Sequence, residues 1–234
     1  LDEKMLYFLM RAVEGKASII VSGGTGSGKT TLLNMLLLGI PENELVVTIE
    51  DSCELKHNRT NIRRLEARLA AGDAGVLSVS VRSLVKNALR MRPDRIIVGE
   101  IRDETIVDMV SAMSTGHEGS LSTVHANSPM NLIKARMPIL YSMYGDSAFT
   151  PEAQAIQLSE ALDLIVHVSR MVDGSRKVTH ITHVAGLEQR QLKLQDVFVY
   201  RDGQFQATGY IPKKLLEKLK GNKVSVDETI FKRT

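Results

Sequence analysis

A run of eight residues near the start of the chain has the composition and spacing of a phosphate-binding loop. Residues 23–30 read Gly-Gly-Thr-Gly-Ser-Gly-Lys-Thr, which fits the pattern G-x-x-x-x-G-K-[ST]. The glycines permit backbone conformations that aim consecutive N–H groups at an anion, the lysine can reach the β- and γ-phosphates, and the threonine hydroxyl can ligate Mg²⁺. The sequence therefore predicts a nucleoside triphosphate site. The expected nucleotide contacts are Gly24, Thr25, Gly26, Ser27, Gly28, Lys29, Thr30 and Thr31.

The segments that flank this loop support the prediction. An apolar run covers residues 17–21, and a helix-like run covers residues 30–38. Strand, loop and helix thus follow one another in the order that phosphate binding requires. A glycine-rich turn without function is the alternative, and this context argues against it.

A carboxylate after a buried strand is the second feature with catalytic potential. Residues 95–98 form a predicted buried strand, and Glu100 follows two residues later. Ligands of open α/β sheets bind beyond the carboxyl ends of the strands, where this carboxylate can hold Mg²⁺ together with Thr30. We therefore predict a catalytic and metal-binding role for Glu100. A strand-end glutamate with no role is the alternative.

A second acidic group, formed by Glu50, Asp51 and Glu54, begins at the last residue of the predicted strand at residues 45–50. Both acidic groups lie on the same edge of the predicted sheet, so both can face one γ-phosphate. We predict that Glu50 and Glu54 both lie at the nucleotide site, where Glu100 is also expected. Asp51 could equally start a loop or cap a helix.

A histidine ends another predicted strand on the same edge. His125 follows residues 120–124, beside Thr123 and Asn127, whose polar groups are suited to sensing a γ-phosphate. We predict that His125 contacts the nucleotide, with a purely structural histidine as the alternative, and His117 is a weaker candidate. The histidines expected to be structural are His167, His180 and His183.

Short apolar runs alternate with helix-period segments up to about residue 170, which predicts an α/β fold with a largely parallel sheet. Expected strands cover residues 17–21, 45–50, 61–68, 95–98 and 120–124. Expected helices cover residues 2–14, 30–38, 81–92, 104–114, 130–144 and 151–162. Thr150 and Pro151 support the start of the last helix as its cap and first-turn residues.

Beyond residue 162 the pattern changes to that of antiparallel strands. Runs at 163–171 and 177–185 flank Asp173-Gly174, and runs at 192–200 and 204–209 flank Asp202-Gly203; both dipeptides are two-residue turn signals. A final helix is expected from about Pro212. We predict a core at residues 1–162 and a smaller β-rich extension with a final helix at residues 163–234, within one domain.

Composition excludes several classes of protein. The single Cys53 cannot form an intramolecular disulfide, and no apolar run reaches the ~20 residues that span a bilayer, so a reducing, cytoplasmic setting is expected. The net charge is +3 and the basic residues are dispersed, which argues against a nucleic-acid partner. Lysines at residues 213–223 are interpreted as a solvated helix face, with an anionic-membrane contact as the alternative.

Four segments, in this order, resemble the type II/type IV secretion ATPase family. They are the phosphate loop, residues 48–55, residues 89–103, and the stretch from Thr115-Gly116-His117 to His125-Ala126-Asn127. They are similar to the Walker A motif, aspartate box, Walker B motif and histidine box of that family. The resemblance covers roughly residues 15–220, and residues 161–170 and 173–176 look most like the tight-adherence (Flp) pilus branch.

This resemblance implies a RecA-like core that binds ATP and Mg²⁺ through Lys29 and Thr30. By matching position, Glu54 positions the attacking water, Glu100 acts with Mg²⁺, and His125 contacts the nucleotide region. It also implies a homo-hexameric motor that powers pilus assembly or protein secretion. That motor would act on an inner-membrane platform protein from the cytoplasmic face.

Members of that family carry a further N-terminal domain that in many of them supplies arginines to the active site. The present sequence opens at Leu1 within a helical pattern, so we expect a fragment of a longer protein. The candidate charge stabilisers in this half are Arg59, Arg63, Arg64, Arg90, Arg92 and Arg102.

Two other functions are weaker alternatives to a motor. A DNA-processing P-loop ATPase is disfavoured because aromatic residues make up only 4% of the chain and no basic stripe is present. A nucleotide-gated scaffold without turnover is disfavoured because a mere binder has little need for both Glu54 and Glu100.

Overall fold

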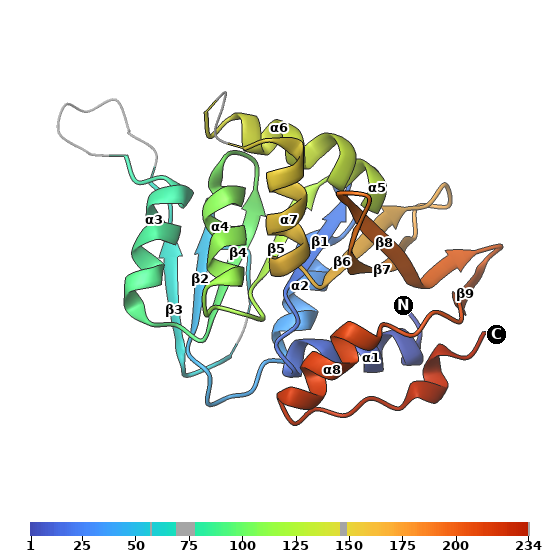
Figure 1. Cartoon of the computed structure of the whole chain (residues 1–234). Coiled ribbons are helices and arrows are strands. Elements are labelled where there is room, and N and C mark those ends of the chain that lie inside the picture. The colour runs from blue at the N-terminus through green and yellow to red at the C-terminus, as the bar shows by residue number, and fades with distance from the viewer. Residues whose placement is uncertain (57, 69–77, 146–148, 234) are drawn as a thin grey trace.

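The computed structural model describes residues 1–56, 58–68, 78–145 and 149–233. These residues form a nine-stranded sheet with the order β3-β2-β4-β5-β1-β6-β7-β8-β9, covered by helices (Figure 1). The strands from β3 to β6 pair in parallel, and those from β6 to β9 pair antiparallel. The predicted α/β fold with a mostly parallel sheet is confirmed.

The strands are β1 (Ile19–Gly23), β2 (Val46–Glu50), β3 (Ile62–Glu66), β4 (Arg95–Ile101), β5 (Leu121–His125), β6 (Leu164–Arg170), β7 (Arg176–Glu188), β8 (Gln191–Arg201) and β9 (Gln204–Ala207). The α-helices are α1 (Glu3–Glu14), α2 (Lys29–Leu37), α3 (Val81–Ala88), α4 (Thr105–Ser114), α5 (Pro129–Asn131), α6 (Met137–Ser142), α7 (Pro151–Ala161) and α8 (Lys213–Gly221). Shorter turns are the 3₁₀ segments η1 (Leu89–Met91) and η3 (Glu228–Phe231) and the π-helical segment η2 (Leu132–Arg136).

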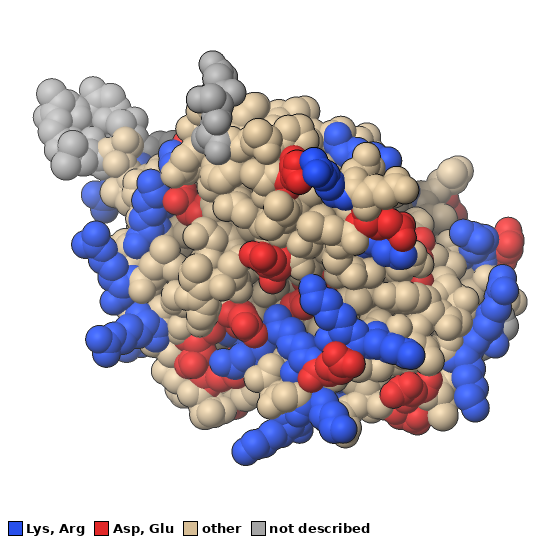
Figure 2. Space-filling model, viewed as in Figure 1, with Lys and Arg blue, Asp and Glu red and all other residues tan. Residues whose placement is uncertain are grey.

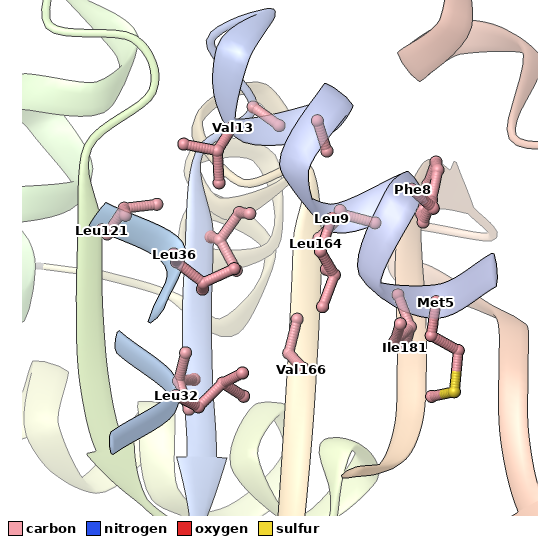
Figure 3. Close-up of a cluster of buried hydrophobic side chains, with 14 of the residues drawn as sticks. Met5, Phe8, Leu9, Val13, Leu32, Leu36, Leu121, Leu164, Val166 and Ile181 are labelled. Carbon is pink, nitrogen blue, oxygen red and sulfur yellow. The ribbon is translucent and has the colours of Figure 1, made fainter. Parts of the chain in front are cut away.

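Helices cover both faces of the parallel half, so its central strands are apolar at successive positions. Side chains alternate between the faces of a strand. In β1, Ile19 and Val21 join the apolar cluster of α1, α2 and α8, part of which Figure 3 shows. Ile20 joins the cluster of α3, α4, α6 and α7. Because each buried side chain of this kind contributes about 1.5–3 kcal/mol, β1 is fixed firmly beneath the loop that follows it.

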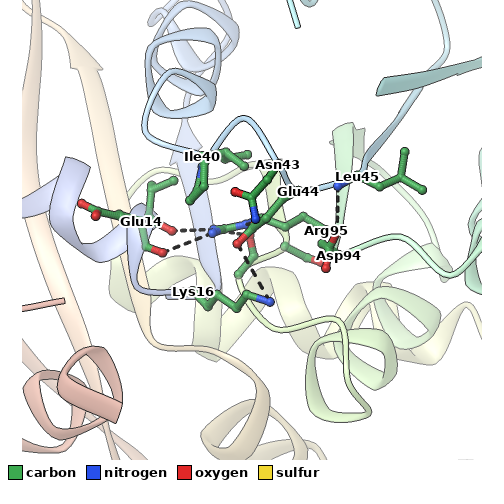
Figure 4. A network of polar contacts seen from close by, with 12 residues as sticks. Glu14, Lys16, Ile40, Asn43, Glu44, Leu45, Asp94 and Arg95 are labelled. Carbon is green, nitrogen blue, oxygen red and sulfur yellow. Dashed lines mark hydrogen bonds and ion pairs between the residues drawn. The ribbon is translucent and has the colours of Figure 1, made fainter. Parts of the chain in front are cut away.

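A buried ion pair fastens α1 to the edge of the sheet opposite the phosphate loop (Figure 4). Arg95 is the first residue of β4 and is fully buried; its Nε donates to Glu44 Oε2 at 2.5 Å. Its Nη1 donates to the carbonyl oxygen of Val13 at 2.5 Å, near the end of α1. The guanidinium thus joins the N-terminal helix to the start of a central strand.

The helix expected over residues 130–144 is interrupted by the π-helical turn η2. Pro138 follows this turn closely, at the second position of α6. Proline donates no backbone hydrogen bond, and its ring clashes with the carbonyl of the residue four positions earlier, so a wider turn relieves the conflict. Arg136 is the last residue of that wider turn.

The C-terminal strands extend the same sheet instead of forming a separate layer. β6 pairs in parallel with β1 on one side and antiparallel with β7 on the other. The prediction of a two-residue turn at Asp173-Gly174 was wrong, because the connection between β6 and β7 has five residues, 171–175. The turn at Asp202-Gly203 is confirmed, with φ of +52° and +79°. Gln189 and Arg190 form a further turn at positive φ that their residue types do not predict.

Within the described residues, no helix is both long and apolar enough to cross a bilayer. Basic and acidic side chains are interspersed on the face that Figure 2 shows. On α8, Lys218 lies 2.7 Å from Asp163 and 3.5 Å from Glu118, and Lys214 donates to the carbonyl of Ser159. These contacts favour the interpretation of α8 as a packed helix with a solvated face.

Candidate nucleotide-binding site

The phosphate loop lies at the carboxyl end of β1 and is closed by contacts to one carbonyl. The oxygen of Gly24 accepts from the Ser27 N–H at 3.3 Å, the Ser27 hydroxyl at 2.8 Å and Lys29 Nζ at 3.0 Å. Gly28 precedes α2 with φ of +97°, a left-handed conformation that favours glycine. A Cβ at Gly23 would lie 2.4 Å from the carbonyl oxygen of Val168, so only glycine fits against β6 there.

Lys29 carries the ammonium group of this loop. Partial burial lowers its pKa, the nearby Glu100 carboxylate opposes that shift, and the Arg102 charge adds to it. A partly desolvated cation beside a loop of backbone N–H groups is suited to binding an anion.

Two acids near the end of β2 have different surroundings: Glu50 is buried, and Glu54 lines a pocket. Glu50 is 5% exposed, and its Oε1 accepts from the N–H groups of Glu54 at 3.0 Å and Leu55 at 2.9 Å. Gly99 makes room for it, since a Cβ there would lie 3.0 Å from Glu50 Cγ. Leu55 is itself buried, which fixes the loop on its far side. Glu50 therefore holds the segment that carries Glu54.

Glu100 lies where β4 bulges out of its pairing with β5. Val98 pairs with Ser122 and Ile101 with Val124, so β4 has one extra residue in this interval. Such bulges redirect side chains. The Arg102 Nη2 donates to Glu100 Oε2 at 2.7 Å, and this contact raises the pKa of Arg102. Glu100 is therefore placed at the carboxyl edge of the sheet with its charge partly balanced.

His125 is next to the start of the phosphate loop because it pairs with Gly23 across β5 and β1. Thr123, expected to assist in sensing phosphate, instead donates to the Gly99 carbonyl at 2.7 Å. His117 precedes the amino end of β5 and so belongs to the opposite edge of the sheet from His125.

Two of the histidines expected to be structural are buried in the C-terminal strands. The Nδ1 of His167 lies 2.9 Å from the Ser22 hydroxyl, directly before the phosphate loop. Burial, assisted by the charge of His180, lowers the pKa of His167 to about 4. His183 is likewise buried, and its pKa is lowered to about 4. Both rings are therefore neutral near pH 7.

A pocket of about 850 Å³ brings most of the predicted site residues together. Its lining includes Thr25, Gly26, Gly28, Lys29, Thr30, Thr31, Glu54, Glu100 and His125. The lining does not include three of the predicted nucleotide contacts, Gly24, Ser27 and Glu50. Gly24 and Ser27 bond to each other within the loop, and Glu50 holds the backbone of Glu54. Four basic and two acidic side chains face this space, so it favours a polyanion.

The pocket is completed by Arg136 and Arg176. The sequence alone did not assign these two arginines to the site. The Nε of Arg136 is buried and has no hydrogen-bond partner among the described residues. A proline inside a helical segment, here Pro138, is a sequence signal for a distorted turn at this place. The direction of the Arg136 side chain, however, depends on how that turn packs. Arg176 follows a turn signal, and only the pairing of β6 with β1 brings it to the loop.

Of the six arginines named as charge stabilisers, only Arg102 lines the pocket. Arg59 is held elsewhere, because its Nη1 donates to the Ile40 carbonyl at 2.6 Å, its Nη2 donates to the Pro41 carbonyl, and its guanidinium pairs with Glu42 at 3.6 Å. Its proposed role at the phosphates within its own subunit has no support from this geometry.

The donor set fits Mg²⁺ bound together with a nucleotide. Thr30 and Glu100 line the same pocket. Among the described residues, no group of three or more His, Cys, Asp or Glu side chains could hold a metal ion. Mg²⁺ commonly uses one or two carboxylates, substrate phosphates and several waters, so a hydroxyl and one carboxylate are sufficient protein ligands.

The sequence matches the family model described as Type II/IV secretion system protein over residues 1–205. This chain belongs to that family. VirB11 of the Bartonella quintana type IV secretion system is 36% identical over 180 residues, covering 77% of this chain and 50% of its own length. A "Putative conjugal transfer protein" of Mycobacterium tuberculosis is 42% identical over 189 residues, covering 80% of this chain and 51% of its own length.

Solved structures of a VirB11 ATPase and of a pilus retraction motor share the fold. The Brucella suis VirB11 ATPase, in complex with sulphate, gives a TM-score of 0.67 at 30% identity, covering 76% of this chain and 52% of its own. The pilus retraction motor PilT with bound ADP gives a TM-score of 0.59 at 24% identity, covering 96% of this chain and 55% of its own. The predicted RecA-like fold and the family are therefore confirmed. This member of the secretion family spans about half the length of the curated relatives named above.

Proposed function

We propose that this chain is the ATP-binding and ATP-hydrolysing part of a motor that powers pilus assembly or protein secretion. The observation that carries the proposal is the convergence of Lys29, Glu54 and Glu100 on one pocket, although they come from three separate strand ends. The sulphate in the Brucella suis VirB11 structure supports anion binding in this family.

The pocket residues divide the work of phosphoryl transfer. Lys29 and the N–H groups of the loop hold the β- and γ-phosphates. Glu54 orients the attacking water and accepts its proton, while Thr30 and Glu100 hold Mg²⁺. Mg²⁺ held there would offset negative charge on the transferring phosphoryl group. His125 and Arg136 contact the phosphate region from the β5 side.

The setting of the motor is proposed from its relatives. We infer a homo-hexamer at the cytoplasmic face of the inner membrane, with a platform protein as its partner and with a further N-terminal domain in the full-length protein. VirB11 relatives are named as components of type IV secretion systems, which supports a secretion or pilus setting. Within this family, the tight-adherence branch and the division into residues 1–162 and 163–234 remain our predictions.

The test is a pair of conservative substitutions, Glu54→Gln and Glu100→Gln, in the assembled full-length protein. Each amide keeps the size of the side chain but cannot act as a base or bring a full negative charge to Mg²⁺, so hydrolysis should fall by about 10²-fold or more. Binding of a fluorescent ATP analogue should change little. Glu217→Gln, on the outer side of α8, serves as the control.

Normal turnover in both variants would mean that the two acids are structural, and the protein would then be a nucleotide-gated scaffold. Stimulation of hydrolysis by DNA, with binding that weakens at higher salt, would instead favour the DNA-processing alternative.

A further inference from the structure

An arginine of the C-terminal strands contacts the phosphate loop directly. Arg176 is the first residue of β7, and its Nε donates to the carbonyl oxygen of Gly26 at 2.9 Å across 150 positions of sequence. The contact follows from the topology: β6 runs parallel to β1, so residues 171–175 turn back at the edge of the sheet where the phosphate loop lies.

The side chain of Arg176 lies across the loop rather than beside it. Besides its contact with Gly26, a Cβ built on Gly28 would lie 3.3 Å from Arg176 Cδ. The same residue lines the pocket that holds Lys29. Arg176 is therefore one wall of the candidate nucleotide site.

The charge of Arg176 has no counterpart in the described part of the chain. No described acidic residue forms an ion pair with it, and the residue directly opposite on β6 is Arg170. Like charges opposite each other across two strands are destabilising. The pocket's other exposed arginine differs in this respect, since Arg102 is paired with Glu100 at 2.7 Å. A bound anion would supply the missing charge for Arg176.

The chemistry of the group also fits a phosphate. A guanidinium carries five N–H donors in a planar fork, and only Nε is engaged by Gly26. The other donors have no acceptor among the described residues. Such a fork matches the oxygens of a phosphate group, and hydrogen bonds to a charged acceptor are stronger than those between neutral groups.

We propose that Arg176 is a phosphate-binding residue of the nucleotide site, contributed by the same subunit: Nε holds Gly26, and the Nη groups bind phosphate oxygens of the nucleotide. This inference rests on the proposed function. It also gives the C-terminal strands a direct connection to the nucleotide, because β7 begins at Arg176 and pairs with β6 and β8 along its length.

The test is equilibrium binding of fluorescent ATP and ADP, with adenosine measured by competition, to this chain and its variants. Arg176→Gln should weaken ATP and ADP binding by about tenfold to a hundredfold, the range for losing hydrogen bonds to a charged group. Adenosine should bind as it does to the unmodified chain. Arg176→Lys should recover part of the loss, because it restores the charge but not the fork. Arg170→Gln, a charge removed from the same hairpin outside the pocket, should change affinity less than about twofold.

The outcomes separate this inference from the function on which it rests. Lys29→Ala is measured in parallel, and circular dichroism confirms that each variant is folded. Unchanged ATP affinity in Arg176→Gln, together with a loss in Lys29→Ala, would overturn the inference and leave the proposed function standing. Equal losses in Arg176→Gln and Arg170→Gln, or an equal loss for adenosine, would also overturn it. Unchanged affinity in Lys29→Ala would instead reject the nucleotide site itself.

Discussion

Glu50 holds Glu54 by its backbone: the carboxylate oxygen Oε1 of Glu50 lies 3.0 Å from the amide nitrogen of Glu54. One acid of the group after β2 is thus buried as a support, and the other lines the pocket. A second bond from the same oxygen to the Leu55 N–H, at 2.9 Å, fixes the direction in which the chain leaves the strand. Glu50 is therefore a positioning residue for Glu54.

We predict that Glu50→Ala lowers kcat by roughly 10²-fold, since a displacement of about 1 Å of a group that orients water has that effect. Glu50→Gln should retain most of the activity, because its amide oxygen can still accept from both N–H groups. Phosphate release by the assembled full-length protein measures kcat, and a fluorescent ATP analogue measures affinity, which should change little. Equal loss of kcat in both variants would mean that the charge of Glu50 matters more than its placement of Glu54.

The division of roles between Glu50 and Glu54 illustrates what the sequence could and could not predict. Both acids follow one apolar strand, and the rule that ligands bind at the carboxyl edge of a parallel sheet places them correctly. Which carboxylate turns inward depends on two contacts of Glu50. One is with Gly99 of β4, and the other is with the N–H group of Leu55 in the following loop. The positions of the strands along the chain and the phosphate loop were predictable because apolar periodicity and glycine spacing are local signals.

The pocket arginines show the opposite case. Arg136 reaches the site from a π-helical turn, and Arg176 from a hairpin paired beside β1. Neither has a local pattern that distinguishes it from the other arginines of the chain. Arg59, by contrast, follows the acidic group in sequence yet donates to carbonyls of the loop after α2. Long-range strand pairing and the packing of a π-helical turn decide such positions, and one sequence does not display them.

The buried pair of Arg95 and Glu44 should matter for stability rather than for catalysis. Removing one partner of a buried ion pair leaves an uncompensated charge or unsatisfied donors, at a cost of about 3–5 kcal/mol. We predict a loss of that size in the free energy of unfolding for Arg95→Ala, measured by urea denaturation of this chain. Arg201→Ala, at the exposed end of β8, should change it by less than about 0.5 kcal/mol. A change below about 1 kcal/mol in Arg95→Ala would contradict the role of this pair in fastening α1.

Stability should also fall in mild acid because of two buried histidines. Burial lowers the pKa of His167 and His183 to about 4, whereas an unfolded histidine titrates near 6.5. Between these values the unfolded state binds protons that the native state does not, so the free energy of unfolding decreases as the pH falls from about 6.5 to about 4. One such group contributes a slope of at most about 1.4 kcal/mol per pH unit.

The measurement is urea unfolding of this chain at a series of pH values in that window. His167→Gln should show a shallower decrease than the unmodified chain, because the titrating ring is gone. Parallel profiles for the two proteins would mean that His167 is protonated in the native state or that other groups dominate the acid response.

Hydrolysis should depend on assembly with the rest of the full-length protein. Of the arginines expected from the sequence as charge stabilisers, Arg102 is already paired with Glu100 and Arg59 is bound to backbone carbonyls, so neither is free to act on a developing γ-phosphate charge. Arg136 and Arg176 are assigned above to binding phosphate, and neither is assigned to the transition state. An arginine supplied by another domain or subunit is worth about 10³–10⁵ in rate in other nucleotide hydrolases. We therefore expect specific activity to rise steeply with the concentration of full-length protein.

Nucleotide affinity is the internal control for that experiment. Lys29 and the phosphate loop belong to a single subunit, so ATP binding should be present at dilutions where hydrolysis is lost. A site completed by a neighbour would also explain how subunits stay coordinated, because the rotation of one subunit then alters catalysis in the next. Specific activity that stays constant on dilution to a demonstrable monomer would reject the shared site, while the measured ATP affinity would still locate binding at Lys29.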